Sequence, residues 1–330
     1  MKDSNTFTSA FAAEYLSVVD QVVAAAVEDI EDDEDTTELI NTSRGPRVEE
    51  PTVAKIMQAV GDFSPDLGLE DTPADWDPFG ATQVLNPGQS NVMFLWGDSH
   101  GNQVKPRLFH RLKAHHHNSS KTFPTIYFRS FDGTAMLPCI NNYTNMVDAI
   151  KALQPKVLLH SINWQRYLRP TGSDADESTK PHQCCTGDYV KDKCQYQRPK
   201  DVVAILNQFQ KDMAELTSLG IRVFIATMNP EGDQFDPKHM LSGDEVGDVR
   251  PVLKSAYREV HKELVGLVEA AIHGANATLL DYSDNYCWED VCQVVDMYGN
   301  PIMKDNNHLR TNFGFKYLSV VDQAVSAAMA

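Results

Sequence analysis

The chain has 330 residues, of which 42% are hydrophobic and 23% are charged, and its formal net charge is −17 at pH 7. These proportions are typical of a globular protein and exclude collagen-like, coiled-coil and wholly disordered chains. The negative charge would repel phosphate backbones, so we expect no nucleic-acid partner. No stretch approaches the roughly 18–20 apolar residues of a membrane-spanning helix, and the N-terminus lacks a signal-peptide core, so we expect no direct membrane insertion.

The N-terminal segment repeats the C-terminal one. Residues 2–26 align without a gap to residues 304–328, and the seven-residue run YLSVVDQ occurs in both copies. Apolar residues in both copies recur at helical spacing, which predicts an amphipathic helix in each. We interpret residues 1–27 as a vestigial helix that duplicates residues 303–329 and that remains from a lost neighbouring copy of the main domain.

A strongly acidic run follows the first copy. Residues 28–38 (EDIEDDEDTTE) hold eight acidic residues and no basic residue. A segment of this composition cannot bury enough apolar surface to fold. We therefore predict a disordered linker over residues 28–50 and a main domain over residues 51–330.

Apolar runs of strand length alternate with segments of helical periodicity along the main domain. The predicted strands are 91–96, 125–128, 156–162, 221–227 and 277–282, and the predicted helices are 103–114, 146–153, 201–219, 252–272 and 317–328. This alternation predicts an α/β protein, a three-layer α/β/α sandwich around a five-stranded, mostly parallel sheet of the flavodoxin-like type. In such sheets ligands bind at the carboxyl ends of the strands.

Six cysteines and four Asn-x-Ser/Thr sequons occur together. The combination favours an oxidising, lumenal or extracellular setting, although this chain shows no export signal. The candidate glycosylation sites are Asn41, Asn118, Asn142 and Asn276.

The spacing of the cysteines favours disulfides over a metal site. A zinc site at Cys184, Cys185 and Cys194 near His182 is the competing interpretation, but no Cys-x2-Cys pair exists. We expect no metal and no cofactor. Four residues separate Cys287 from Cys292, which makes them the favoured pair. The polar segment 171–200, which carries three cysteines, is predicted to be an insertion loop tied by disulfides.

The first candidate site is the run Gly97-Asp98-Ser99-His100-Gly101, at the end of the first strand and the start of a helix. A serine there lies at the positive end of a helix, where backbone amides can face a developing oxyanion. In the alternative interpretation, Asp98 or Ser99 merely caps the helix. His100 either takes part in the site or hydrogen-bonds behind Ser99.

The second candidate site is the run Asp305-Asn306-Asn307-His308-Leu309, just before the last helix. A serine hydroxyl becomes a good nucleophile when a histidine takes its proton and an acid orients that histidine. Asp305 and His308, three residues apart, can meet in this way. Alternatively, Asp305 or Asn306 caps the helix and His308 lies at the surface.

Two weaker candidates follow the other early strands. Asn163 and Trp164 close the third strand, where an asparagine could donate to an oxyanion and a tryptophan could wall a pocket; a polar turn with a core tryptophan is the alternative. Gly133 follows the second strand and could offer a backbone N–H, although Asp-Gly is also a common turn dipeptide.

Together these four clusters resemble the blocks of the SGNH (GDSL-like) esterase superfamily. Ser99 matches its serine, Gly133 its glycine, Asn163 its asparagine, and Asp305 with His308 its D-x-x-H block. The likeness covers roughly residues 85–330 and is closest to the SGNH domain fused behind the membrane-embedded acyltransferase-3 domain. Those domains show WGDSH, a short cysteine pair and D-x-x-HL, which correspond here to the residues Trp96–His100, Cys287 with Cys292, and Asp305–Leu309.

The third block departs from the family pattern, since Ser161 replaces its glycine and Trp164 its aspartate. The N-terminal repeat has Thr6 where the C-terminal copy has His308, so it cannot complete a site. The resemblance implies an oxyanion hole formed by Ser99, Gly133 and Asn163, and a pocket that includes Asp98, His100 and Trp164.

The resemblance implies acyl transfer through Ser99, with His308 as base and Asp305 orienting the imidazole. The acyl group would be small, such as acetyl, and the substrate an acylated sugar or glycolipid, so the chain would be an O-acyl esterase or acyltransferase. The implied partner is an acyltransferase-3 membrane domain, upstream or in trans, at the extracellular or lumenal face of a membrane. The alternatives are a catalytically inactive SGNH-fold binding module and a structural domain of a larger secreted or membrane protein.

Overall fold

A computed structural model describes residues 49–62, 67, 69, 71–73, 81–118, 122–140, 142–170 and 197–330. All of them belong to the unit Thr42–Ala330. The predicted helix at 1–27, the acidic linker up to residue 48, the sequon at Asn41 and residues 171–196 of the predicted loop lie outside the described residues.

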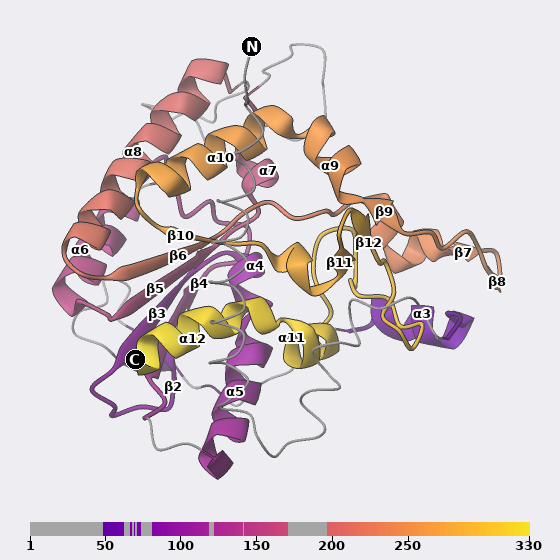
Figure 1. Ribbon diagram of the computed structural model, residues 1–330, viewed down its shortest axis with the longest axis horizontal. Coiled ribbons are helices and arrows are strands. Elements are labelled where there is room, and N and C mark those ends of the chain that lie inside the picture. Colours follow the sequence, from indigo (N-terminus) through magenta and orange to yellow (C-terminus); the bar gives the residue numbers. More distant parts are fainter. Residues whose placement is uncertain are drawn as a thin grey trace, which may run out of the picture. The chain divides into compact units, whose positions relative to one another are not determined.

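The described part is built on a seven-stranded sheet with the strand order β1-β2-β4-β3-β5-β6-β10 (Figure 1). The strands are β1 (Asp71–Pro73), β2 (Ala81–Leu85), β3 (Val92–Gly97), β4 (Thr125–Ser130), β5 (Val157–Ser161), β6 (Arg222–Ala226) and β10 (Thr278–Leu280). The five predicted strands form a continuous parallel block, from β4 to β10. This confirms the α/β fold with a mostly parallel sheet.

The prediction of five strands is wrong by two, because β2 and β1 extend the sheet beyond β4. Both added strands run antiparallel to their neighbours. They are short and carry polar residues such as Thr82 and Gln83, so they lack the apolar run that marks the others. The parallel strands β3 and β5 are instead buried along nearly their whole length, as expected for strands covered on both faces.

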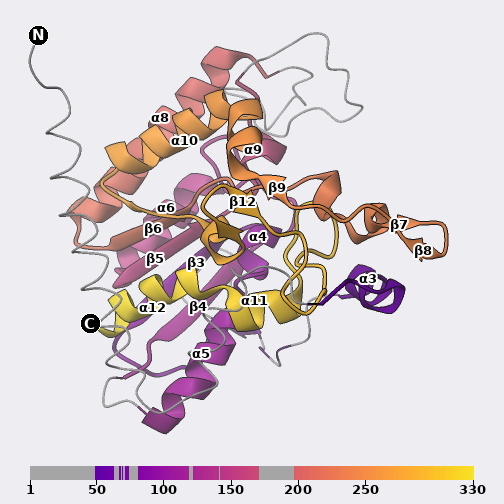
Figure 2. The same cartoon turned by 45° about the vertical axis from the view of Figure 1, so that its right-hand side comes forward.

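Helices cover both faces of the sheet (Figures 1 and 2). One layer contains α6 (Tyr143–Leu153), α8 (Pro199–Ser218) and α10 (Lys262–Gly274), whose apolar faces belong to one large core cluster with the strands. The other layer contains α5 (Lys105–Asn118), α11 (Thr311–Tyr317) and α12 (Asp322–Met329). Helix α12 packs against β3 and β5. The three-layer arrangement places the ends of β3, β4 and β5 between these layers.

Several predicted helix boundaries need correction. The predicted helix 252–272 consists of strand β9 (Val252–Leu253), helix α9 (Lys254–Val260) and helix α10. The predicted helix 317–328 is split by a 3-10 turn, η5 (Ser319–Val321), between α11 and α12. Helix α8 begins at Pro199, so the predicted loop 171–200 ends two residues too late. A proline at the first helical position fits there because its missing N–H needs no partner.

Smaller elements complete the described part. Helix α3 (Val53–Val60), which periodicity did not predict, follows the linker. The remaining elements are α4 (Ser99–Asn102), α7 (Trp164–Tyr167), η2 (Asp233–Phe235), η3 (Pro237–Met240), η4 (Tyr282–Asn285), and the strands β7 (Leu241–Ser242), β8 (Glu245–Val246), β11 (Cys287–Trp288) and β12 (Val291–Cys292). Of the helices in the described ranges, none is both long and apolar enough to cross a membrane.

A small three-stranded sheet carries the favoured cysteine pair. Cys287 and Cys292 lie directly opposite each other in the β11–β12 hairpin and are joined by a disulfide. Strand β12 also pairs with β9, so the hairpin is attached to the start of α9. Cys139 is disulfide-bonded as well.

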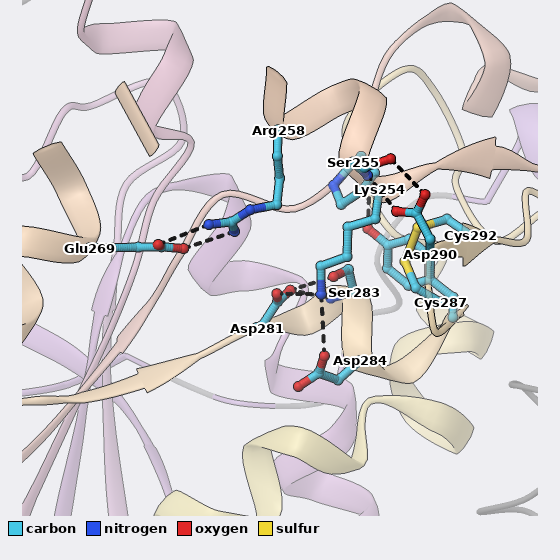
Figure 3. Close-up of polar contacts among 12 residues, drawn as sticks. Lys254, Ser255, Arg258, Glu269, Asp281, Ser283, Asp284, Cys287, Asp290 and Cys292 are labelled. Atoms are coloured by element: carbon cyan, nitrogen blue, oxygen red, sulfur yellow. Dashed lines mark hydrogen bonds and ion pairs between the residues drawn. A yellow bond between two sulfur atoms is a disulfide. The ribbon is translucent and has the colours of Figure 1, made fainter. Parts of the chain in front are cut away.

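Polar contacts hold the start of α9 against this hairpin and against the segment around η4 that precedes it (Figure 3). The ammonium of Lys254 lies 2.7 Å from Asp281 and 3.4 Å from Asp284. The hydroxyl of Ser255 donates to Asp290, in the hairpin turn, over 2.6 Å. Burial opposes the charge on Lys254, but the two aspartates outweigh it and raise the pKa of this lysine.

Candidate active site

The turn after β3 positions Ser99. Gly97 ends the strand, Asp98 caps helix α4, and Ser99 is the first residue of that helix. A Cβ on Gly97 would lie 2.1 Å from the carbonyl oxygen of Ser161, so only glycine fits where β3 passes β5. The serine is therefore held at the carboxyl edge of the parallel sheet, as the sequence predicts from the strand pattern.

Asp98 fixes this turn from behind. Its carboxylate accepts from the amide of His100 at 2.7 Å, from the hydroxyl of Tyr167 at 2.7 Å and from the amide of Asn163 at 3.1 Å. The side chain is completely buried, and burial raises its pKa. Asp98 thus ties the ends of β3 and β5 together. It lies beneath Ser99. A cavity opens beside Ser99, and Asp98 is not among the residues that line it.

The C-terminal motif meets Ser99 across a long stretch of sequence. The Nε2 atom of His308 lies 2.8 Å from the Oγ atom of Ser99. The Nδ1 atom of the same ring lies 2.9 Å from one oxygen of Asp305 and 3.0 Å from the other. The three side chains therefore form a continuous hydrogen-bonded series from carboxylate to imidazole to hydroxyl. A series of this kind can carry a proton away from the serine.

Local hydrogen bonds keep Asp305 ionised. Partial burial opposes its negative charge, but the His308 ring and the amides of Asn307 and His308 outweigh that effect and lower its pKa to about 2. The last helices do not use Asp305 or Asn306 as a cap, because α11 begins at Thr311 with Arg310 at the capping position. The capping alternative for this motif is therefore wrong.

The loop that carries Asp305 and His308 is closed on itself. Met303 and Leu309 form an isolated β-bridge, and the amide of Lys304 donates to the carbonyl of His308 at 2.9 Å. Two outside contacts hold the loop in place. The amide of Leu309 donates to the side chain of Gln103 at 2.8 Å, and the amide of Gly232 donates to the carbonyl of Asn306 at 2.7 Å.

The two candidate oxyanion donors occupy different surroundings. Gly133 has a φ of +69° and lines the same cavity as Ser99. Asn163 is buried, and its side-chain oxygen caps α7 by accepting from the amide of Arg166 at 3.1 Å. Its side-chain nitrogen lies 3.5 Å from a carboxylate oxygen of Glu231. Asn163 does not line the cavity that Ser99 and Gly133 share.

His100 and Trp164 do not line this cavity. The ring of His100 is buried behind His308, with 5.2 Å between the ring centroids, and burial lowers its pKa to about 3. His100 is therefore neutral near pH 7. Trp164 is part of the core, where its indole N–H donates to the carbonyl of Ala226 at 2.8 Å.

A cavity of about 630 Å³ opens beside Ser99 and His308, with Gly133 and Asp305 in its wall. Motif reasoning missed the charged residues that complete this wall, namely Lys105, Asp132, Arg166 and Lys304. Asp132 directly precedes Gly133, and Lys304 directly precedes the D-x-x-H block. Lys105 begins a helix at the end where an acidic residue is usual. No cluster of three or more potential metal ligands occurs among the described residues.

The described sequon asparagines differ in their positions. Asn142 is exposed at the start of α6, and Asn276 is exposed with a φ of 53° in the turn before β10. Asn118 is the last residue of α5.

A family model described as "SGNH domain (fused to AT3 domains)" matches residues 65–321. The chain belongs to this SGNH family. Membership supports an ester-acting hydrolase or acyltransferase in general, and it agrees with the α/β fold and mostly parallel sheet. In this family the SGNH domain is fused to AT3 domains.

Solved structures resemble the SGNH chain in fold. The periplasmic domain of a lipopolysaccharide acetyltransferase from Salmonella ser. Paratyphi A matches with a TM-score of 0.43 and 13% identity, over 72% of this chain and 84% of its own. The acetyl xylan esterase AlAXEase matches with a TM-score of 0.39 and 14% identity, over 71% of this chain and 99% of its own. Est24, a carbohydrate acetylesterase from Sinorhizobium meliloti, matches with a TM-score of 0.36 and 12% identity, over 72% of this chain and 99% of its own. No curated protein matches the sequence.

Proposed function

We propose that the protein is a serine-dependent O-acyl esterase or acyltransferase that acts on a carbohydrate or glycoconjugate through an acyl-Ser99 intermediate. The observation that carries the proposal is the hydrogen-bonded series Ser99–His308–Asp305, with 2.8 Å between the hydroxyl and the imidazole. The series faces a cavity of about 630 Å³, a size that suits a sugar-sized ligand.

In the first half-reaction, Ser99 Oγ attacks the carbonyl carbon of the ester while its proton passes to Nε2 of His308. Asp305 accepts from Nδ1, which holds the ring in the required tautomer and stabilises the imidazolium. The bond from carbon to the alcohol oxygen then breaks. His308 returns the proton to that oxygen, so the products are the free alcohol and acyl-Ser99.

The oxyanion of the tetrahedral intermediate needs donors beside Ser99. We assign this role to the backbone amides of Ser99 and Gly133 and to the side-chain amide of Asn163. The position of Ser99 supports the first of these, because Ser99 is the first residue of α4 and the N-terminal end of a helix favours negative charge. Asn163 supplies its second amide hydrogen, since the first lies toward Glu231.

In the second half-reaction, an acceptor oxygen attacks acyl-Ser99 and His308 takes its proton. Water as acceptor completes an esterase cycle, and a sugar hydroxyl completes a transferase cycle. The AT3 fusion of the family supports a partnership with an acyltransferase-3 membrane domain, in the same polypeptide or in trans. It also supports an extracellular or lumenal site of action with a small acyl group such as acetyl. Exposed Asn142 and Asn276 are then available for glycosylation.

Labelling by a fluorophosphonate probe tests the proposal. The full chain is produced in a secretory host beside Ser99→Ala, His308→Ala and two matched controls on exposed residues, Ser326→Ala and His273→Ala. We expect the wild type and both controls to be labelled, and both site variants to lose the label.

A folded wild-type protein that remains unlabelled would contradict the proposal. It would favour the alternative, a catalytically inactive SGNH-fold binding or structural module of a larger secreted or membrane protein. Acetate release from acetylated sugars, with and without an added sugar acceptor, then separates hydrolysis from transfer.

For the domain organisation, we propose that residues 51–330 are the functional unit, preceded by an acidic linker over 28–50 and a vestigial helix over 1–27. Limited proteolysis that cuts within 28–50 and leaves labelling intact would support this division. Loss of labelling upon such cleavage would contradict it.

A further inference from the structure

The segment that follows β6 contacts two parts of the candidate site. The amide of Gly232 donates to the carbonyl of Asn306 at 2.7 Å, in the loop that carries His308. The residue before it, Glu231, presents its carboxyl to Asn163, whose side-chain nitrogen lies 3.5 Å from the Oε1 atom. Two neighbouring residues of one segment therefore reach both the loop of the base and the assigned oxyanion donor.

The orientation of the Asn163 side chain is set by its hydrogen bonds. Its backbone amide donates to Asp98 at 3.1 Å, and its side-chain oxygen accepts from the amide of Arg166 at 3.1 Å. Because the oxygen is engaged at α7, the nitrogen occupies the other end of the amide and lies beside Glu231. One N–H of this nitrogen is directed at the carboxyl. The other has no partner among the described contacts, so it is the N–H that can donate to an oxyanion.

Other contacts fix the backbone around this pair. The indole of Trp164, at the start of α7, donates to the carbonyl of Ala226, the last residue of β6, at 2.8 Å. The hydroxyl of Tyr286 donates to the carbonyl of Pro230 at 2.9 Å. Neither contact involves the side chain of Glu231. Truncation of that side chain should therefore remove one hydrogen bond and leave the two segments in place.

The carboxyl of Glu231 lies in acidic surroundings. Burial raises its pKa well above the ordinary range of a glutamate, the carboxyls of Asp98 and Asp305 raise it further, and the hydrogen bond from Asn163 opposes this shift. No lysine or arginine of the described residues contributes. A protonated carboxyl accepts from the amide through its carbonyl oxygen and adds no negative charge beside the assigned oxyanion donor. A neutral glutamine side chain offers the same acceptor.

We propose that Glu231 is a positioning residue of the Ser99 site, whose carboxyl holds the side-chain amide of Asn163 so that its second N–H is directed at the oxyanion. Glu231 does not line the cavity, and it acts through Asn163 rather than on the substrate. The inference rests on the proposed function, because it adds a supporting residue to the assigned oxyanion hole.

The rate constant of fluorophosphonate labelling tests this role, because the attack of Ser99 on phosphorus also places negative charge on an oxygen in the oxyanion hole. In the full chain at neutral pH, Glu231→Ala should react about tenfold to a hundredfold more slowly than the wild type. Glu231→Gln should react at close to the wild-type rate, since its amide oxygen can accept the same hydrogen bond.

The matched control is Glu245→Ala, at an exposed glutamate of the β7–β8 hairpin, which should react like the wild type. Thermal unfolding checks that each variant is folded. A Glu231→Ala protein that reacts as fast as the wild type, or a folded Glu231→Gln protein that is as slow as Glu231→Ala, would overturn the inference.

A double-mutant cycle distinguishes positioning from a general structural role. If Glu231 acts through Asn163, Glu231→Ala should have no further effect on the labelling rate in a protein that already carries Asn163→Ala. An effect of the same size in both backgrounds would show that Glu231 acts by another route, and it would overturn the inference.

NMR separates this inference from the proposed function. The side-chain amide of Asn163 is observed in the full chain labelled with 15N-asparagine and is assigned by its loss in Asn163→Ala. We expect Glu231→Ala to shift its two proton signals and to speed their exchange with water, and Glu231→Gln to preserve both. That result supports the inference even if the wild type fails to react with the fluorophosphonate, which would contradict the proposed function alone. Unchanged Asn163 signals in Glu231→Ala would overturn the inference even if Ser99 is labelled.

Discussion

The hydroxyl of Tyr167 donates a hydrogen bond of 2.7 Å to the carboxylate of Asp98, in the interior directly behind Ser99. The contact joins the end of α7 to the turn after β3. Both side chains are fully buried, so bulk water cannot take the place of either one if the hydrogen bond is removed. The position of the candidate nucleophile thus depends on a polar contact that never touches the cavity.

Tyr167→Phe should destabilise the protein by about 1–3 kcal/mol, because it leaves a buried carboxylate with one donor fewer. The measurement is urea unfolding of the wild type and the variant at neutral pH. Tyr298→Phe, at an exposed tyrosine, is the control and should leave stability unchanged. A Tyr167→Phe protein as stable as the wild type would show that the contact contributes nothing.

The lowered pKa of Asp305 predicts a pH-dependent stability. Because the folded state lowers the pKa of this carboxyl to about 2, its stabilising effect is complete above the ordinary pKa of about 3.9. The effect is lost as the pH falls from about 4 toward 2. The difference in unfolding free energy between the wild type and Asp305→Asn should therefore narrow across that range. A difference that stays constant from pH 5 to pH 2 would disagree with this account.

Gly97 and Gly266 provide a matched pair of glycine substitutions. Gly97→Ala would place a Cβ 2.1 Å from the Ser161 carbonyl, so β3 and β5 would have to separate and the folded yield should collapse. Gly266 lies exposed in α10 with no atom within 4 Å of such a Cβ, so Gly266→Ala should stabilise the protein by about 0.5–1 kcal/mol. Thermal unfolding measures both. Similar effects of the two substitutions would refute the steric explanation.

The Cys287–Cys292 disulfide closes a short loop, so its contribution should be modest. For a loop of this length the chain-entropy relation gives about 2 kcal/mol. We expect Cys287→Ala combined with Cys292→Ala to lower the unfolding free energy by that amount while labelling of Ser99 persists. Urea unfolding and the fluorophosphonate assay measure the two effects. Loss of labelling in a folded double variant would show that the hairpin also supports the site.

Local patterns predicted the parallel sheet, and the resemblance of two short motifs to a known family implied the series Ser99–His308–Asp305. Five apolar runs marked the parallel strands, and the serine and histidine lie in motifs next to a strand end and a closing helix. Other features depend on contacts between distant segments. Strands β1 and β2 are short and polar, and they exist because β4 offers an edge.

The cavity wall was harder to predict than the triad. Arg166 belongs to no motif, and only the approach of α7 to the Gly133 segment brings it beside Ser99. Trp164 shows the opposite case, since an aromatic residue after a strand looked suited to a pocket but fills the core instead. A linear pattern cannot distinguish these two outcomes, because the backbone turn at Asn163 decides which side chain points inward.

The hydrogen bond between Ser99 and His308 joins residues 209 positions apart. A ribosome synthesises the chain from its N-terminus, at roughly 5–20 residues per second. Ser99 is therefore synthesised at least about ten seconds before His308. During that interval the nascent chain holds an ordinary, unreactive hydroxyl, so the proposed reaction through Ser99 cannot begin until the segment that carries His308 has been synthesised.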